Sequence, residues 1–270
     1  GLATYTTAGA QSVRMLQDGK GPASNITDVS GGINLFESAI FGNLTGVSGA
    51  PLSVVKYQLG VAAAANLLLV GQNFPYNHMI GAWDATTGVT LPAYPTVTDD
   101  YQFLSSSTIA KVVAGTSNQI VSGTGLGLLH AYDGITGLDV SGFPKVTGGW
   151  LFAPAALSDD GRVAAITREG FLFQWNVGQP ACQSEWPSFR HDQQGSGNYD
   201  RDGTPPGALT GFTASQSGSS VTLNWKATGD DNLCGTAAQY RVLVDGVAKT
   251  TGLPAPAAAG TAQSLVLNNL

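Results

Sequence analysis

The sequence has few charged residues and a small acidic excess. Asp, Glu, Lys and Arg make up 11% of its 270 residues, and the formal net charge is −6. A nucleic-acid partner would demand clustered cations to neutralise its phosphates, so this balance predicts no nucleic-acid binding. A surface poor in charge and rich in Ser, Thr, Asn and Gly is more typical of secreted proteins. We therefore expect an extracellular or cell-surface location.

Long apolar stretches are also missing. The longest, residues 59–70, contains Gly60 and Asn66 and is too short to cross a bilayer. Residues 1–32 lack the basic start and apolar block of a signal peptide, so a signal for secretion would have to precede Gly1. We expect no membrane span.

Residues for catalysis are scarce. The only histidines are His78, His130 and His191, and none begins a metalloprotease motif. A nucleophile elbow of the type Gly-x-Ser-x-Gly and a P-loop lysine are absent as well. We expect His130 to be a packed, hydrogen-bonded residue on a strand and His191 to be structural as well. The sequence thus favours a protein that is not an enzyme and holds no cofactor.

What the sequence does contain is a repeat. The heptapeptide that ends at Gly88 recurs at Gly137, 49 residues later, and a fixed period of this size is typical of a propeller or another repeat array. Its aspartates and threonines are expected to accept backbone N–H groups in a turn. A catalytic group is rarely needed once per repeat, so we interpret these residues as structural: Trp83, Asp84, Thr87 and Gly88, and Tyr132, Asp133, Thr136 and Gly137.

Strand patterns divide residues 1–199 into units of about four strands. The clearest unit, residues 101–149, has strands predicted within 101–114 and at 118–122, 127–132 and 138–146. The preceding unit, residues 33–100, has strands predicted at 33–41, 66–71 and 79–83, with residues 43–58 as a loop or an added hairpin. The third unit, residues 150–192, has strands predicted at 152–157, 161–167 and 171–176, with Trp186-Pro187 in the position of the fourth strand. Residues 1–32 resemble the end of a further unit.

These units predict an all-β fold with a partial β-propeller of about three to four four-stranded blades. A propeller usually closes with four to eight blades. We therefore expect the remaining blades to come from the same precursor or from a second chain.

The Asp-x-x-Thr-Gly turn preceded by an aromatic residue resembles the repeats of PQQ-like quinoprotein propellers. The layout of strands with Phe143-Pro144 near a blade end also resembles bacterial extracellular propellers of the FG-GAP (VCBS) type. Together the resemblances cover about residues 1–200. They imply a binding platform; the tryptophan that follows Thr-Gly in quinone-docking repeats is missing after Gly88 and Gly137, so no quinone is expected.

Residues 200–207 contain Asp, Gly and a Pro pair and are predicted to be a linker. In residues 208–270, strands are predicted at 209–214, 221–225, 240–246 and 265–270. Trp225 at the end of a strand and the Tyr-x-Val-x-Val strand resemble a fibronectin type III domain. Such a sandwich takes about 90–100 residues, so this domain is expected to be incomplete.

Cys182 and Cys234 are the only cysteines. In a secreted protein a disulfide between the two domains is the sharper interpretation, and two free thiols or pairing with other segments are the alternatives. Asp192, Asp200 and Asp202, with Asn198, are candidates for a calcium site, although their spacing fits turn and linker chemistry better.

Together these features predict a non-enzymatic extracellular scaffold or adhesion protein, with other surface proteins or a polysaccharide as possible partners. Two alternatives from other classes stay open. The chain could be the propeller portion of a secreted enzyme, either a quinoprotein-like oxidoreductase or the accessory domain of a hydrolase. It could also be a subunit of a surface filament or assembly.

Overall fold

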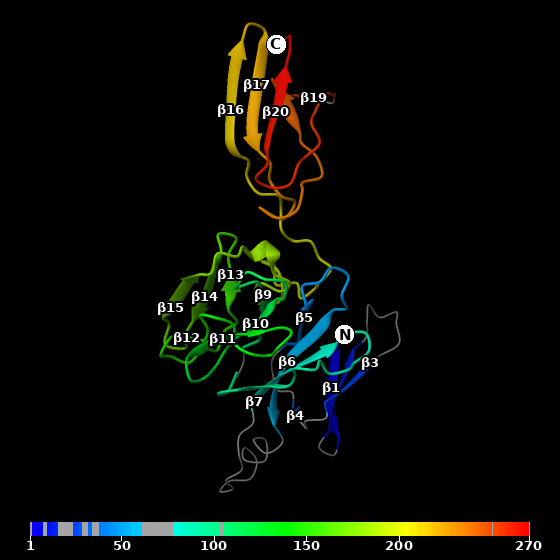
Figure 1. Cartoon of the computed structure of the whole chain (residues 1–270), viewed down its shortest axis with the longest axis vertical. Helices are drawn as coiled ribbons and strands as arrows, with labels where there is room; N and C mark the ends of the chain where they lie inside the picture. Colours follow the sequence, from blue (N-terminus) through cyan, green and yellow to red (C-terminus); the bar gives the residue numbers. More distant parts are fainter. Residues whose placement is uncertain are drawn as a thin grey trace. The chain divides into compact units, whose positions relative to one another are not determined.

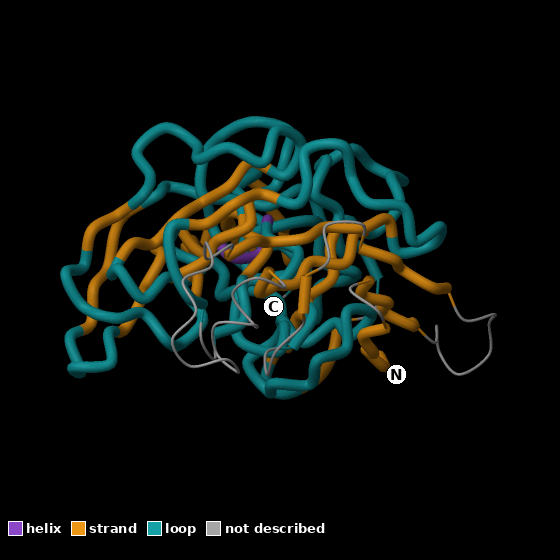
Figure 2. Tube along the Cα trace, turned by 90° about the horizontal axis from the view of Figure 1, so that it is seen from below, coloured by secondary structure: helices purple, strands orange, loops and turns teal. Residues whose placement is uncertain are grey.

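A computed structural model describes residues 2–7, 10–15, 24–28, 32–33, 38–60, 78–102, 105–249 and 251–269, with only the backbone up to residue 33 and at 58–60. The chain divides into unit 1, Gly1–Arg201, and unit 2, Asp202–Leu270. The predicted all-β class is confirmed: the described part contains small antiparallel sheets and one short 3-10 helix, η1 (Ala181–Gln183) (Figures 1 and 2). No helix in this part is long and apolar enough to cross a membrane.

Unit 1 contains three sheets for which side chains are described, and an N-terminal sheet of β1 (Leu2–Thr7), β2 (Ala10–Met15) and β3 (Ser24–Asp28). Sheet 1 comprises β4 (Gly32–Ile33), β5 (Ile40–Gly42), β6 (Ser53–Gly60), β7 (His78–Asp84) and β8 (Thr96–Thr98). Sheet 2 comprises β9 (Thr108–Ala110), β10 (Gln119–Gly123), β11 (Leu128–Asp133) and β12 (Lys145–Val146). Sheet 3 comprises β13 (Ala156–Leu157), β14 (Arg162–Ile166) and β15 (Leu172–Asn176).

The three sheets stack face to face through apolar side chains. Successive strand residues point to opposite faces, and on β10 Ile120 belongs to the core shared with sheet 1, whereas Val121 belongs to the core shared with sheet 3. Sheet 2 is therefore covered on both faces, and its buried residues include the polar side chains of Thr108, Gln119, Ser122 and His130. Figure 1 shows β13–β15 at the left of unit 1, β9–β11 beside them, and β5 and β6 to the right of these.

The prediction for the first unit was partly wrong. Residues 43–58 were expected to form a loop or an added hairpin, but β6 begins at Ser53 and pairs with β7 along its length, Val54 opposite Trp83 and Val55 opposite Ala82. Val54 and Val55 are buried on opposite faces, so this segment is a central strand. The likeness to residues 118–123 assigned the strand instead to residues 66–71, which lie outside the described residues; the chain between β6 and β7 is longer than that between β10 and β11, so the spacing of the repeat does not locate β6.

The position predicted for Trp186-Pro187 was also wrong. They do not add a fourth strand to β15; instead, Trp186 exchanges two backbone hydrogen bonds with Ile109 of β9, of 2.8 and 3.1 Å. Leu157 of β13 donates its N–H to the carbonyl of Pro187. Trp186 is 3% exposed and packs in the core between sheets 1 and 2, so burial of this ring draws the segment toward the first strands of the sheets.

Unit 2 contains a three-stranded sheet and a hairpin. The sheet has the order β16 (Thr210–Ser217), β17 (Ser220–Lys226) and β20 (Ala262–Leu267). The hairpin joins β18 (Val242–Val244) to β19 (Val247–Lys249) through Asp245-Gly246, both with positive φ, which is the turn that Asp-Gly favours. Trp225 contacts Tyr240 edge-on at 5.2 Å and forms the core with Leu265 and Leu267.

The structure contains one disulfide, and neither Cys182 nor Cys234 is a free thiol. The pairing inferred from the sequence predicts that the two units stay covalently joined when the linker is cut. A site-specific protease sequence inserted after Gly203 tests this on gels run with and without reductant. We expect one band before reduction and two after it, and two bands under both conditions in the double variant Cys182→Ser/Cys234→Ser. Two bands without reductant in the wild-type protein would contradict the pairing.

Candidate functional site

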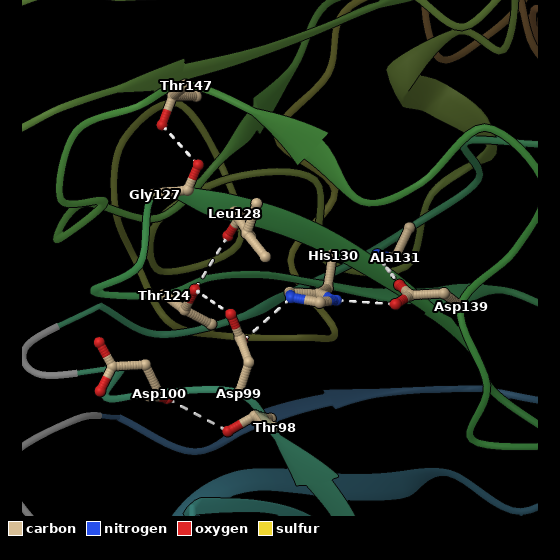
Figure 3. Close-up of polar contacts among 10 residues, drawn as sticks. All are labelled: Thr98, Asp99, Asp100, Thr124, Gly127, Leu128, His130, Ala131, Asp139 and Thr147. Atoms are coloured by element: carbon tan, nitrogen blue, oxygen red, sulfur yellow. Dashed lines mark hydrogen bonds and ion pairs between the residues drawn. The ribbon is translucent and has the colours of Figure 1, made fainter.

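A buried ionic cluster in unit 1 is centred on His130, on β11. Its Nδ1 lies 2.7 Å from Oδ2 of Asp139, and its Nε2 lies 3.1 Å from Oδ1 of Asp99 (Figure 3). The angle at Nε2 does not satisfy a hydrogen bond, so the contact with Asp99 is mainly ionic. The imidazole side chain is only 8% exposed, and each carboxylate side chain is about a quarter exposed.

Three different segments supply this cluster. Asp99 directly follows β8 of sheet 1, His130 lies on β11 of sheet 2, and Asp139 follows the repeat turn of sheet 2. Asp139 is held because its Oδ1 also accepts the N–H of Ala131 at 3.1 Å, and Asp99 is held by the hydroxyl of Thr124 at 3.3 Å (Figure 3). The cluster thus joins sheet 1 to sheet 2.

Two further hydrogen bonds follow the same boundary. The Tyr94 hydroxyl donates to the carbonyl of Asp133 at 3.2 Å, and the Thr96 hydroxyl donates to the carbonyl of Gly137 at 2.8 Å. We call these two bonds, together with the contact between Asp99 and His130, the polar seam. The φ of Gly137 is 66°, and a Cβ there would lie 2.5 Å from Oγ1 of Thr96, so the seam requires glycine at this position.

The charges in the cluster support one another. Burial acts to lower the pKa of His130, but the hydrogen bond to Asp139 and the charges of Asp139 and Asp99 outweigh it and raise that pKa to about 9. Burial acts to raise the pKa of Asp99, but the charge of His130 and the hydrogen bond from Thr124 lower it overall. The imidazole is therefore protonated at neutral pH, with both nitrogens directed at carboxylates.

His130 was expected to be a hydrogen-bonded strand residue, and it has carboxylate partners that sequence reasoning did not identify. Asp99 and Asp139 lie outside the repeated motif: 49 residues away, their counterparts are Gly148 and Thr90. The sequence feature that could have identified Asp99 as a site residue is its position directly after a strand, where polar groups often lie at the edge of a sheet. The stacked ring of Tyr132, 5.1 Å from that of His130, was predicted only as a motif residue.

The other two histidines have aromatic neighbours. Nδ1 of His78 lies 2.8 Å from the Tyr57 hydroxyl, and its ring lies 4.4 Å from that of Tyr101. His191 meets Trp186 edge-on at 5.0 Å. Burial lowers the pKa of both imidazoles despite nearby carboxylates, so these two histidines are neutral at pH 7, in contrast to His130.

The repeated aspartates organise turns. Oδ1 of Asp84 accepts the N–H groups of Thr86 and Thr87 at 2.9 and 2.7 Å, and Oδ1 of Asp133 accepts those of Ile135 and Thr136 at 3.0 and 2.9 Å. Burial acts to raise the pKa of both carboxyl groups, but hydrogen bonds lower it overall: those of the turn for Asp84, and that of the Ser117 hydroxyl together with those of the turn for Asp133. Gly88 and Gly137 end the turns with positive φ. Trp83 and Tyr132, which directly precede the two aspartates in the chain, are buried.

The calcium candidates are engaged in local turns. Asp192 accepts the N–H of Ser196 at 2.9 Å and lies 3.8 Å from Nε of Arg201. Asp200 is exposed, and Asp202 accepts the N–H of Thr204 at 3.2 Å. Within the described ranges, no group of three His, Cys, Asp or Glu residues is arranged to hold a metal ion.

No protein-family model matches the chain, and no curated protein matches it.

The cluster predicts a measurable contribution to stability. His130→Gln removes the shared cation between two partly buried carboxylates, so we expect the free energy of unfolding to fall by about 2–3 kcal/mol. Urea denaturation measures this loss, with an unchanged m value as the sign that both states keep their compactness. In a double-mutant cycle with Asp139→Asn we expect coupling of about 1 kcal/mol or more. Additive effects would contradict the ionic link.

The same cluster predicts how stability depends on pH. The pKa of His130 is raised from 6.5 to about 9, so its contribution is complete below pH 6.5 and is lost as the pH rises through 9. The pKa of Asp99 is lowered from 3.8, so its contribution is complete above pH 3.8 and is lost in more acidic solution. The stability difference between wild type and His130→Gln should therefore be largest between about pH 4 and 6.5. NMR titration of the imidazole gives the pKa directly, and a value near 6.5 would refute this dependence.

Proposed function

We propose that this protein is a non-enzymatic extracellular scaffold or adhesion protein. In this proposal unit 1 is a partial β-propeller with sheets 1–3 as successive blades, and unit 2 is a fibronectin type III-like sandwich. Its partners would be further blades, other surface proteins or a polysaccharide.

The observation that carries the proposal is how His130 is used. A general base must be neutral near the working pH and must have a nitrogen free to take a proton. His130 is protonated at pH 7, is 8% exposed at its side chain, and directs both nitrogens at carboxylates. The group with the chemistry closest to that of a catalytic site is thus committed to joining two sheets.

The stacking of the sheets supports the propeller assignment. Trp83, Tyr132 and Trp175 hold matching places, each on the third main strand of its sheet, opposite Val54, Ile120 and Val163 on the second. Tyr132 lies in the core between sheets 1 and 2, and Trp175 packs on the core between sheets 2 and 3. In sheets 2 and 3 the aromatic side chain at this position therefore faces the preceding sheet. This is expected for blades that follow one another around an axis.

Two features of the chain are compatible with the extracellular location in this proposal. One disulfide is present, and disulfides persist mainly in oxidising compartments. The low content of charged residues agrees with such a location.

The proposal predicts binding without turnover. Beads coated with the folded protein should retain at least one extracellular polymer from a set of cellulose, chitin, peptidoglycan and collagen, and beads coated with reduced, unfolded protein should retain none. Added pyrroloquinoline quinone with calcium should neither bind stoichiometrically, as followed by near-ultraviolet absorbance, nor support dye reduction with alcohols or sugars. Quinone uptake with dye reduction would favour the oxidoreductase instead.

A further inference from the structure

In sheets 1 and 2, the third strand is covered along its outer edge by the segment that follows it. On β7, the N–H of Asp84 donates to Val89 at 2.9 Å, and the carbonyl of Ala82 accepts the N–H of Leu91 at 2.9 Å. On β11, the N–H of Asp133 donates to Leu138, and Ala131 accepts from Val140, at 2.8 and 2.9 Å. Strands β8 and β12 then complete the two edges.

Strand β15 is the counterpart of β7 and β11 in sheet 3, and none of the described residues covers its outer edge in this way. At the two ends of its pairing with β14, Thr167 donates to Phe171 at 2.9 Å and Val177 donates to Gly161 at 2.8 Å. Antiparallel bonding alternates, so Phe173 and Trp175 bond to β14. The main-chain groups of Leu172, Gln174 and Asn176 point outward, and none of the hydrogen bonds in the described part of the chain uses them.

The segment after β15 leaves the edge because it lacks the repeat turn. Asn176-Val177-Gly178 takes the place of Asp133-Gly134-Ile135, and Val177 and Gly178 both donate back to Gly161. The chain then forms η1 and continues to Trp186 beside β9. The open edge lies at the left margin of unit 1 in Figure 1.

The edge also lacks the features that normally block pairing. Residues 171–176 contain no charge and no proline, and β15 pairs with β14 without a bulge. Phe171 and Leu172 are 66% and 71% exposed. An uncovered, uncharged and partly apolar edge of this kind is a template for another strand.

We propose that the outer edge of β15 accepts an extended strand from a partner chain, antiparallel to β15. The occupant resembles the chain's own edge segments: an aromatic-proline pair followed by alternating polar and aliphatic residues, as in Phe143 to Thr147. Sheet 2 has four strands and sheet 3 has three. By comparison with sheet 2, the edge of β15 therefore has room for one added strand. This inference rests on backbone geometry and does not depend on the scaffold role.

The test uses the whole chain and a labelled peptide of residues 138–147, LDVSGFPKVT, with fluorescence anisotropy as the readout. Gln174→Pro removes an outward N–H without touching a bond to β14, which is where an edge strand tolerates proline. We expect it to weaken peptide binding by about tenfold or more, whereas Gln174→Ala, which keeps the N–H, should bind as the wild type does. Amide exchange should slow at Leu172, Gln174 and Asn176 and stay unchanged at Phe173.

A second pair of reagents covers the case in which Gln174→Pro fails to fold. Lys145 and Val140 of the peptide are the residues whose N–H groups face the third strand in sheet 2. Methylating these two amides should abolish binding, and methylating that of Val146 should not. Three results would overturn the proposal: no binding at about 1 mM peptide, equal binding by Gln174→Pro or by the doubly methylated peptide, or a wild-type dimer in sedimentation that Gln174→Pro dissolves.

Discussion

Unit 1 depends on the burial of sheet 2 on both of its faces. Sheet 2 alternates between two cores: Ile120 and Tyr132 belong to the core shared with sheet 1, and Val121 and Leu129 belong to the core shared with sheet 3. Each of these side chains is at most 4% exposed. Burial of such side chains contributes about 1.5–3 kcal/mol each, so no sheet of this kind is stable alone. The repeated strand pattern places apolar side chains where neighbouring sheets meet, so that the sheets can pack on one another.

The boundary between sheets 1 and 2 has a polar component whose side-chain hydrogen bonds are not repeated by the described residues between sheets 2 and 3. Tyr94 and Thr96 donate across it, and their counterparts by offset are Phe143 and Lys145, of which Phe143 packs in the second core and Lys145 lies over its ring at 5.1 Å. The ion cluster of His130 is likewise confined to the first boundary. A buried charge is costly unless paired, and this pairing requires one geometry, so the cluster specifies how these two sheets meet.

The sequence predicted what depends on local chemistry or on strict periodicity. The all-β class and the strands of sheet 3 could be predicted because Gly, Asp and alternating apolar residues act over a few positions. It could not predict β6, because an insertion shifts the spacing, nor the bridge from Trp186 to Ile109, because that contact joins residues far apart in the chain. The contacts of Asp99 and Asp139 with His130 could not be predicted for the same reason, because they form only after two sheets have stacked.

The open edge of β15 and the position of Trp186 have a common cause. In sheets 1 and 2 the aspartate of the repeat binds the next N–H groups and turns the chain back along the third strand. Asn176 instead bonds Gly178 through its side chain, and Pro180 precedes η1, so the chain turns inward. Trp186 then covers β9 and fills the core between sheets 1 and 2. Because one turn motif is replaced, the chain pairs with β9 through Trp186 and leaves the outer edge of β15 uncovered by the described residues.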